Sequence, residues 1–234
     1  MRQFFYNCKS FVQLLLPQNC LLCDAHSGKS LICTACTADL PRFHTPACPI
    51  CALPSPQGEI CGQCLKHPPT FDATRAAFIY DFPLDALVKT LKYGGHLAVA
   101  EFLAGEMLDA APTSRPDLLV PMPLHPQRLK ERGFNQSLEI ARKLSQAWGI
   151  PLVTAGIIRT RHNEPQASLP LAKRAANVRG IFTVSGDFKG KSILLVDDIM
   201  TSGASLNELA KTLKKAGAVR VECCVAARTL PLSH

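Results

Sequence analysis

Hydrophobic and polar positions divide the chain into a cysteine-rich N-terminal part and a longer part in which strand and helix patterns alternate. Residues 193–196 are a continuous apolar run, which is typical of a strand buried on both faces of a parallel sheet. A helix is predicted directly afterwards, and Gly217 is expected to end it. Its apolar positions recur at helical spacing and are Leu206, Leu209, Ala210 and Leu213.

The same two patterns extend through residues 71–234, which follow a stiff linker at Pro68 and Pro69. Further strands are predicted at residues 75–80, 118–120, 157–158 and 219–227, with an edge strand or hairpin at 181–184. Further helices are predicted at residues 84–91, 97–111 and 137–148. Strands that alternate with helices indicate an α/β domain built on a parallel sheet flanked by helices. Cys223 and Cys224 fall in the last strand, where we expect them to be buried and inert.

Residues 1–19 form an apolar but interrupted segment, which we interpret as an amphipathic helix. It is too short and too polar to span a bilayer, and it lacks the pattern of a signal peptide. The sequence therefore predicts a cytoplasmic protein without an integral membrane span. Peripheral attachment of this segment to the inner face of the membrane is an alternative.

Residues 20–67 contain a repeat of the pattern C-x₂-C-x₉-C-x₂-C, in which each later cysteine lies 28 positions after its counterpart. Its eight cysteines are Cys20, Cys23, Cys33, Cys36, Cys48, Cys51, Cys61 and Cys64. This spacing suits a double zinc ribbon with two zinc ions, each bound by four thiolates, and metal binding would stabilise units too small for a core of their own. A disulfide scaffold is disfavoured because nothing indicates an oxidising compartment. Spacing alone leaves sequential and interleaved ligand pairing open, and we predict sequential pairing because each repeat is self-sufficient.

The net charge of the chain is only weak evidence for a particular ligand. The chain has a formal net charge of +8. A basic balance fits a polyanionic ligand such as a pyrophosphate or a nucleic acid, but it is also common on ordinary solvated surfaces.

Candidate chemistry follows the buried run at residues 193–196. Asp197 and Asp198 come where the strand is expected to reach water, and a turn of small residues leads into the next helix. The turn consists of Thr201, Ser202, Gly203, Ala204 and Ser205. Turn amides and a helix N-terminus can hold a phosphate, while the carboxylates can accept hydrogen bonds from sugar hydroxyls. No lysine lies in the turn, so this is not a P-loop.

A second candidate anion loop follows the predicted strand at residues 118–120. The loop consists of Pro121, Met122, Pro123, Leu124 and His125, with Arg128 and Arg132 in the basic turn after it. Ligands bind beyond the carboxyl ends of parallel strands, so this loop is our candidate for holding a pyrophosphate. The polar stretch at residues 159–179 is long for a loop inside a compact domain, and such loops are usually either functional, for example as a lid, or disordered.

These motifs together resemble the ComF family, whose members join a double zinc ribbon to a type I phosphoribosyltransferase domain and are linked to natural transformation. The resemblance rests on the cysteine pairs, VPMPLHPQRLKERGFNQ, the RTRHNEPQASL…KRAANVRGIF segment and ILLVDDIMTSGAS, which span about residues 20–205 in the family's order. It implies three parts: an N-terminal segment at 1–19, a double zinc ribbon at 20–67 and a phosphoribosyltransferase-like domain at 71–234.

The resemblance also implies a site. Asp197 and Asp198 would bind the ribose hydroxyls of phosphoribosyl pyrophosphate (PRPP) or a related sugar phosphate. Residues 201–205 would bind the 5′-phosphate, residues 121–125 with Arg128 and Arg132 would bind the pyrophosphate with magnesium, and Arg161 would belong to a lid at 161–166.

Two functions follow from this resemblance. The first is magnesium-dependent transfer of ribose 5-phosphate to an acceptor, by a protein associated with DNA uptake. Some purine transferases carry an acidic base where this chain has Thr201, so a base would have to come from elsewhere. The second is non-catalytic handling of single-stranded DNA, together with DNA-uptake proteins, on the same scaffold.

Overall fold

The computed structural model describes residues 18–110, 112, 114–161 and 178–231. The predicted amphipathic segment therefore lies outside the described residues, apart from its last two positions. Among the helices that are described, none combines the length and the apolar character needed to cross a bilayer.

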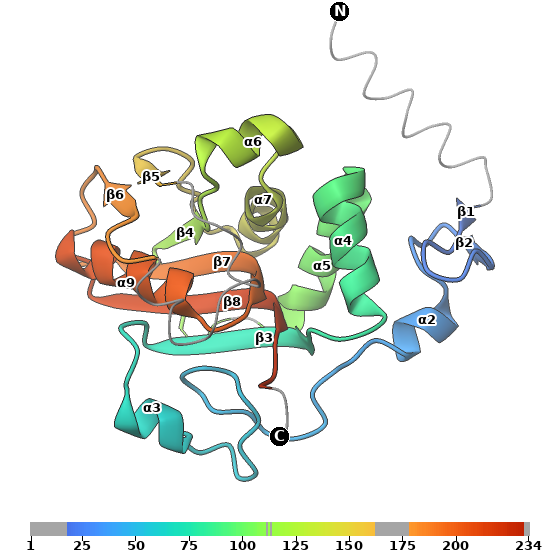
Figure 1. Ribbon diagram of the computed structural model, residues 1–234, viewed down its shortest axis with the longest axis horizontal. Coiled ribbons are helices and arrows are strands. Elements are labelled where there is room, and N and C mark those ends of the chain that lie inside the picture. Colours follow the sequence, from blue (N-terminus) through green and yellow to red (C-terminus); the bar gives the residue numbers. More distant parts are fainter. Residues whose placement is uncertain (1–17, 111, 113, 162–177, 232–234) are drawn as a thin grey trace, which may run out of the picture.

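The described chain contains short elements in its first part and regular strands and helices after residue 72 (Figure 1). The strands are β1 (Gln18–Asn19), β2 (His26–Gly28), β3 (Ala73–Ile79), β4 (Leu118–Pro121), β5 (Ile157–Arg159), β6 (Phe182–Val184), β7 (Ser192–Met200) and β8 (Arg220–Arg228). The α-helices are α2 (Thr34–Ala38), α3 (Gly62–Lys66), α4 (Leu84–Gly94), α5 (Leu97–Met107), α6 (Pro126–Arg132), α7 (Gln136–Trp148) and α9 (Ala204–Lys215), and the 3₁₀ helix η1 (Leu108–Ala110) follows α5.

Four parallel strands form the central sheet in the order β3-β8-β7-β4. β7 lies between β8 and β4, with Val196 opposite Cys224 on one side and Pro121 on the other. The carboxyl ends of β4 and β7 consequently meet at one edge of the sheet, as the predicted ligand loops require.

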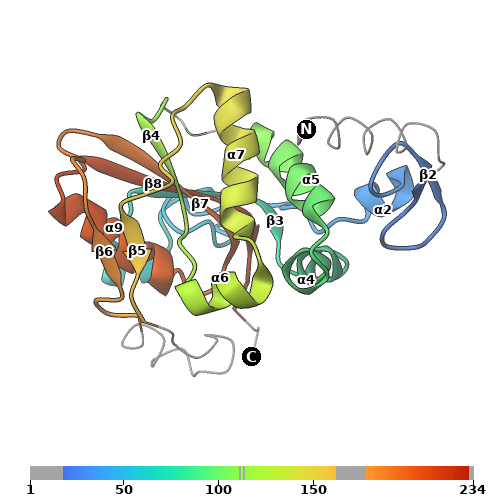
Figure 2. The same ribbon diagram turned by 90° about the horizontal axis from the view of Figure 1, so that it is seen from above.

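Both faces of the sheet are buried, as the uninterrupted apolar run predicts. On one face, α4, α5 and α7 contribute to a core cluster that includes Val196 and Cys224 (Figure 2). On the other face, α9 and the antiparallel pair of strands β5 and β6 contribute to a cluster with Leu195 and Cys223. Burial raises the pKa of both thiols, to about 12 for Cys224, so they remain protonated and unreactive at neutral pH.

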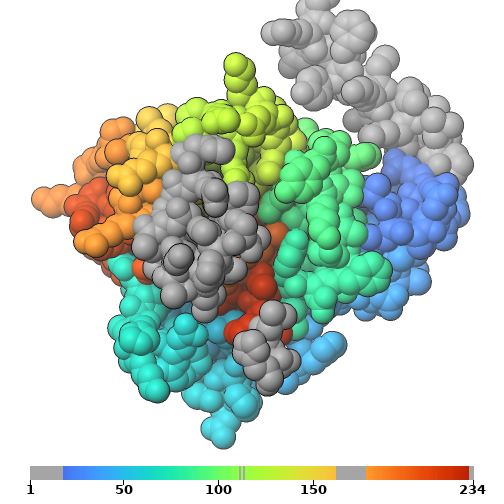
Figure 3. Space-filling view, viewed as in Figure 1, coloured from blue at the N-terminus to red at the C-terminus, as the bar shows by residue number. Residues whose placement is uncertain are grey.

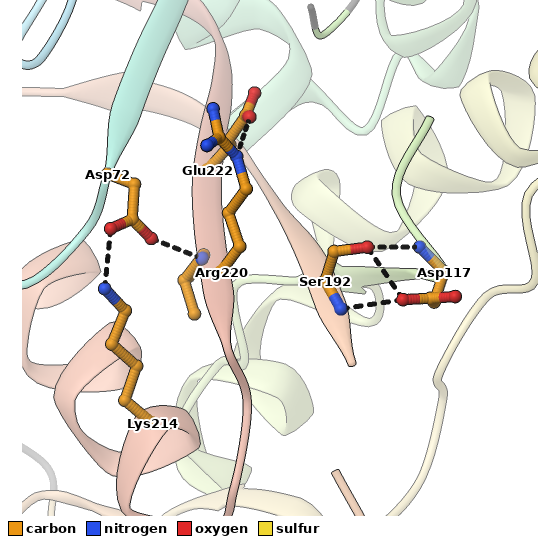
Figure 4. A network of polar contacts seen from close by, with 7 residues as sticks. Asp72, Asp117, Ser192, Lys214, Arg220 and Glu222 are labelled. Carbon is orange, nitrogen blue, oxygen red and sulfur yellow. Dashed lines mark hydrogen bonds and ion pairs between the residues drawn. The ribbon is translucent and has the colours of Figure 1, made fainter. Parts of the chain in front are cut away.

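Polar contacts close the amino-terminal edge of the sheet (Figure 4). Asp117, just before β4, accepts hydrogen bonds from the amide and the hydroxyl of Ser192 at the start of β7, both at 2.7 Å. Asp72, just before β3, pairs with Lys214 of α9 and accepts from the Val221 amide, again at 2.7 Å. These contacts fix the starts of all four strands, so the opposite edge is the one left for a ligand.

Most predicted elements of this domain are confirmed, but one helix was not predicted and one predicted helix ends earlier than expected. The prediction of a basic turn after residue 125 is wrong, because Pro126–Arg132 forms the short helix α6 with Pro126 in its first turn. The predicted helix at 97–111 ends as an α-helix at Met107 and continues as the 3₁₀ helix η1. The predicted apolar face of α9 is confirmed at every position, and Gly217 follows the helix with a φ of 100°.

The two halves of the zinc-ribbon region contact different parts of the larger domain (Figures 1 and 3). Cys20, Ile32 and Leu40 of the first half belong to the same core cluster as α4 and α5. The segment leading into the second half lies along β3, where Ile79 donates to the Pro41 carbonyl at 2.7 Å and Thr74 donates to the Pro49 carbonyl at 3.0 Å. The module therefore covers the free edge of β3, which limits pairing with another chain.

Candidate functional site

The eight repeat cysteines form two clusters, with Cys20, Cys23, Cys33 and Cys36 in one and Cys48, Cys51, Cys61 and Cys64 in the other. Within each cluster the four sulfur atoms lie within 4.8 Å of one another. Ligand pairing is therefore sequential, as predicted, and interleaving is excluded.

The sulfur spacing fits zinc and not disulfides. The Sγ atoms of Cys23 and Cys33 are 3.7 Å apart, and those of Cys51 and Cys61 are 3.6 Å apart. Tetrahedral zinc with Zn–S bonds of about 2.3 Å separates its sulfur ligands by about 3.8 Å, whereas a disulfide requires about 2.05 Å. Each cluster is thus the right size for one zinc ion.

The repeat in the sequence is also a repeat in structure. Cys20 donates to the Ala25 carbonyl and Cys48 to the Leu53 carbonyl, both at 2.7 Å. The residues between them, Asp24 and Ala52, take left-handed conformations with φ of 61° and 55°. The turn therefore brings the paired cysteines together in the same way in each half. Burial alone would raise the pKa of Cys20, but backbone amides lower it to about 6, which favours the thiolate that a metal requires.

The acidic pair lies within β7 and not beyond it, because the strand continues to Met200. Asp198 is only 3 % exposed, so the expectation that both carboxylates face water is wrong for this residue. Its Oδ2 atom lies 2.7 Å from Nζ of Lys92 at the end of α4. This ion pair compensates the buried charge and raises the pKa of Lys92 against the opposing effect of burial.

Asp197 is held by a different set of contacts. Its Oδ1 accepts from the Ser137 hydroxyl at 2.8 Å and from the Asp198 amide at 2.9 Å. Removal from water, followed by repulsion from Asp198, raises the pKa of Asp197 to about 8, although Ser137 and Lys92 oppose the shift. Asp197 therefore carries a proton at neutral pH while Asp198 is paired with Lys92.

The turn after β7 borders a small pocket of about 50 Å³ at the start of α9. The pocket is lined by Asp197, Ile199, Met200, Thr201, Gly203, Ser205 and Leu206. Gly203 has a φ of 77°, and a Cβ atom there would lie 2.6 Å from Cε of Met200. The glycine is therefore required by the backbone and by packing beneath the turn, in addition to any close approach of a ligand.

The loop after β4 is hydrogen-bonded to β7 at the same carboxyl edge of the sheet. The Met122 amide donates to the Val196 carbonyl at 2.8 Å, and the Asn135 side chain donates to the Met122 carbonyl at 3.0 Å. Asn135 also caps α7, accepting from the Ser137 amide at 3.0 Å. One short segment thus fixes residues 121–125, α7 and the hydroxyl that contacts Asp197.

Arginines surround this edge. Arg132 on α6 donates to the Gln136 side chain at 2.7 Å and lies over the Tyr93 ring at 5.7 Å. Arg159 on β5 has a buried Nε atom without a hydrogen-bond partner among the described residues. Burial, followed by repulsion from Arg128, lowers the pKa of Arg159, whereas Asp197 opposes this shift. Arg128, Arg159 and Asp197 therefore share one region, and the two guanidinium groups favour an anion there.

The structure describes only part of the predicted lid. Arg161 is exposed directly after β5, and residues 162–166 lie outside the described residues. Sequence reasoning missed Lys92 and Ser137 as parts of the site, and it placed Arg159 in the candidate lid, whereas the structure places it on β5. Their signals were weak, because each is an ordinary polar residue near the end of a helix or strand.

Comparisons with known proteins agree with the two parts of the structure. Residues 11–65 match the family described as double zinc ribbon domain, and residues 133–230 match the phosphoribosyl transferase domain. The chain is 30% identical over 230 residues to DNA utilization protein YhgH of Escherichia coli K12, covering 93% of this chain and 100% of that protein. It is 28% identical over 216 residues to competence protein F of Haemophilus influenzae, covering 87% and 93%. It is 24% identical over 220 residues to competence protein ComFC of Bacillus subtilis, covering 85% and 89%.

Metal analysis of the purified protein should return close to two zinc equivalents per chain. Cys20→Ser or Cys48→Ser should each lower this value by about one, because each removes a ligand from a different cluster. Cys48→Ser should also lower the unfolding temperature of the larger domain more than Cys20→Ser, since the turn around Cys48 bonds to β3. A value near one equivalent in the unaltered protein contradicts the assignment.

Asp197 should make stability depend on pH. Its pKa is about 8 in the folded protein against 3.8 unfolded, so the folded state holds an extra proton between these values and stability falls as pH rises across that interval. Asp197→Asn removes this penalty and should raise the melting temperature above pH 8 by at least about 2–4 °C, equivalent to ~1 kcal/mol.

The measurement is thermal unfolding from pH 5 to 9, with exposed Asp187→Asn as the matched control. The advantage of Asp197→Asn should grow with pH and then level off. An advantage that is constant across this range contradicts the raised pKa.

Proposed function

The chain belongs to the ComF family, and on this basis we propose that it binds PRPP and takes part in DNA uptake during natural transformation. The relatives named competence protein F and ComFC support the second half of this proposal. The first half rests on the geometry at the carboxyl edge of the sheet.

One observation carries the PRPP proposal: a carboxyl group, a turn of small residues and the start of a 12-residue helix border the same pocket. The N-terminus of α9 and the amides before it favour a phosphate. Asp197 also lines this pocket, so a sugar attached to that phosphate would lie close to the carboxyl groups. We assign the 5′-phosphate to residues 201–205 and the ribose hydroxyls to Asp197 and Asp198.

We assign the pyrophosphate to residues 121–125, with help from Arg128, Arg132 and Arg159. The repulsion between Arg128 and Arg159 is relieved when an anion lies between them, which supports this assignment. Magnesium, when bound with PRPP, would neutralise part of the pyrophosphate charge, as a hard cation that prefers oxygen ligands.

Transfer of ribose 5-phosphate would break the bond between the anomeric carbon and the pyrophosphate oxygen, which leaves with the bonding electrons. The acceptor would supply the electron pair for the new bond at that carbon. The negative charge on the departing pyrophosphate would be stabilised by Arg128, Arg132 and Arg161. Thr201 has no carboxylate and cannot act as a general base. An acceptor that must lose a proton would therefore need a base from another residue.

A second candidate function is binding of single-stranded DNA without turnover. The observation that favours it is the basic character of α6, in which Arg128 and Arg132 lie four residues apart on one face and Lys130 lies on another. Phosphate contacts of this kind bind all sequences alike. DNA-uptake proteins would then be the partners that pass the strand on.

We also propose a cytoplasmic location, because eight reduced thiolates suit a reducing compartment. Residues 1–19 would account for any peripheral attachment to the inner face of the membrane.

PRPP binding is tested by calorimetric titration with magnesium present. Asp197→Asn combined with Asp198→Asn should weaken binding by about tenfold or more, because the charge-assisted hydrogen bond to Asp198 alone contributes roughly 1.5–3 kcal/mol. Ribose 5-phosphate should compete with PRPP at this site.

Two controls make this test specific. Asp187→Asn makes the same chemical change on the exposed surface and should leave affinity unchanged. Asp198→Asn leaves Lys92 without its counter-charge, so thermal unfolding must be recorded, and Asp197→Asn alone keeps that ion pair intact. Unchanged affinity in a folded double variant rules out the ribose assignment.

DNA binding is tested by the dependence of single-strand affinity on salt. Affinity should fall steeply with salt, with a logarithmic slope of about −0.7 for each phosphate neutralised. Substituting Arg128 and Arg132 with Gln should weaken binding of all sequences alike and make the slope shallower. Affinity that does not change with salt would argue for base stacking and against this site.

A further inference from the structure

Arg228 is a buried cation at the end of a buried strand. It is the last residue of β8 and is only 5 % exposed. An isolated cation in such a place is strongly destabilising unless it is paired and fully hydrogen-bonded. The hydrogen-bond partners of Arg228 therefore indicate which parts of the structure its charge stabilises.

One side of the guanidinium faces the second zinc cluster. Nε donates to the Cys51 carbonyl at 2.8 Å. Cys51 is one of the four cysteines of this cluster, so the guanidinium is bonded directly to a loop that carries a zinc ligand. Four thiolates around one Zn²⁺ retain a net negative charge, so Arg228 is also the counter-charge of the loaded centre.

The other side of the guanidinium faces the turn after β7. Nη1 donates to the Met200 carbonyl at 3.0 Å, to the Thr201 carbonyl, and to the Thr229 carbonyl at 2.9 Å. Met200 and Thr201 line the small pocket at the start of α9. A single side chain thus bonds both to a zinc-binding loop and to the turn that borders the pocket.

The first zinc cluster lacks this kind of link among the described residues. It joins the larger domain through Cys20 and Ile32, which belong to the core cluster that includes residues of α4 and α5. The two centres are alike in their repeat but differ in what their loops contact.

We propose that Arg228 is a positioning residue that couples the second zinc centre to the sugar-phosphate turn. Zinc in the second cluster holds the Cys51 loop and the charge of Arg228 in place, and Arg228 in turn holds the carbonyls of Met200 and Thr201 so that the turn amides point at the ligand. Coupling of this kind is reciprocal, so a ligand in the turn must also slow loss of zinc from the second centre. The ligand part of this proposal rests on the proposed PRPP function.

Two variants that keep every cysteine test the coupling in the full-length zinc-loaded protein. Arg228→Lys keeps the charge but loses the fork that reaches several carbonyls, and Arg42→Lys is its matched control. Arg42 also joins the module to the larger domain, through Glu106 and the Phe78 ring, but it contacts neither the second cluster nor the turn in the described residues. We expect Arg228→Lys to weaken PRPP binding by about fivefold or more and Arg42→Lys to leave it unchanged.

Hydrogen exchange supplies a readout that needs no PRPP. Amides of residues 201–205 should exchange at least about fivefold faster in Arg228→Lys than in the unaltered protein. Cys61→Ser should have a larger effect on these amides than Cys33→Ser, its repeat counterpart in the first cluster. Equal exchange in Arg228→Lys and the unaltered protein overturns the coupling.

Zinc release to a chelator tests the reverse direction on the unaltered protein. PRPP should slow release of one zinc equivalent and leave the other unaffected, and this protection should be lost in Arg228→Lys. If PRPP binds but protects neither zinc ion, the coupling is wrong. If PRPP does not bind while the exchange of residues 201–205 still follows Arg228, the proposed function fails and the coupling stands.

Discussion

The four parallel strands are buried on both faces, and this constraint determines how the buried charges of the sheet, Asp198, Glu222 and Arg228, are arranged. A charged group in such a sheet must be paired, because water cannot reach it. Asp198 is paired with Lys92, Glu222 with Arg220, and Arg228 with backbone carbonyls. These pairs connect the sheet to α4 and to the zinc-ribbon region, so the charges that the sheet tolerates are also those that join its surroundings together.

The zinc-ribbon region is part of this arrangement and not an appended module. Its second half and the segment leading into it cover the free edge of β3 through backbone hydrogen bonds from Thr74 and Ile79. A free edge strand invites pairing with other chains, and covering it removes that hazard. Because each half is too small to fold on an apolar core, metal binding becomes a condition for protecting the edge of the larger domain.

Local patterns predicted much of this structure, and contacts between distant segments account for what they missed. The apolar positions of α9 and the cysteine repeat were readable because helical spacing and ligand spacing are local properties of the chain. Helix α6 was missed because Pro126–Arg132 has no apolar periodicity and is stabilised mainly by its capping residues. Lys92 and Arg228 were missed as partners because their contacts join segments far apart in the sequence. A charged residue closing the apolar strand Arg220–Arg228 was the available signal, since a cation there requires partners nearby.

The acidic pair poses a difficulty for the proposed ligand, because two carboxylates beside a phosphate site would repel a polyanion. The arrangement of the two side chains removes most of this repulsion. Lys92 neutralises Asp198, and the raised pKa of Asp197 leaves that carboxyl protonated near neutral pH. A protonated carboxyl can donate one hydrogen bond and accept others, while an ionised one only accepts. Asp197 and Asp198 therefore offer different hydrogen-bonding characters at adjacent positions, which suits a pair of neighbouring hydroxyl groups that each donate and accept. The burial that raises the pKa of Asp197 and the ion pair between Lys92 and Asp198 thus together make the acidic pair compatible with a phosphate nearby.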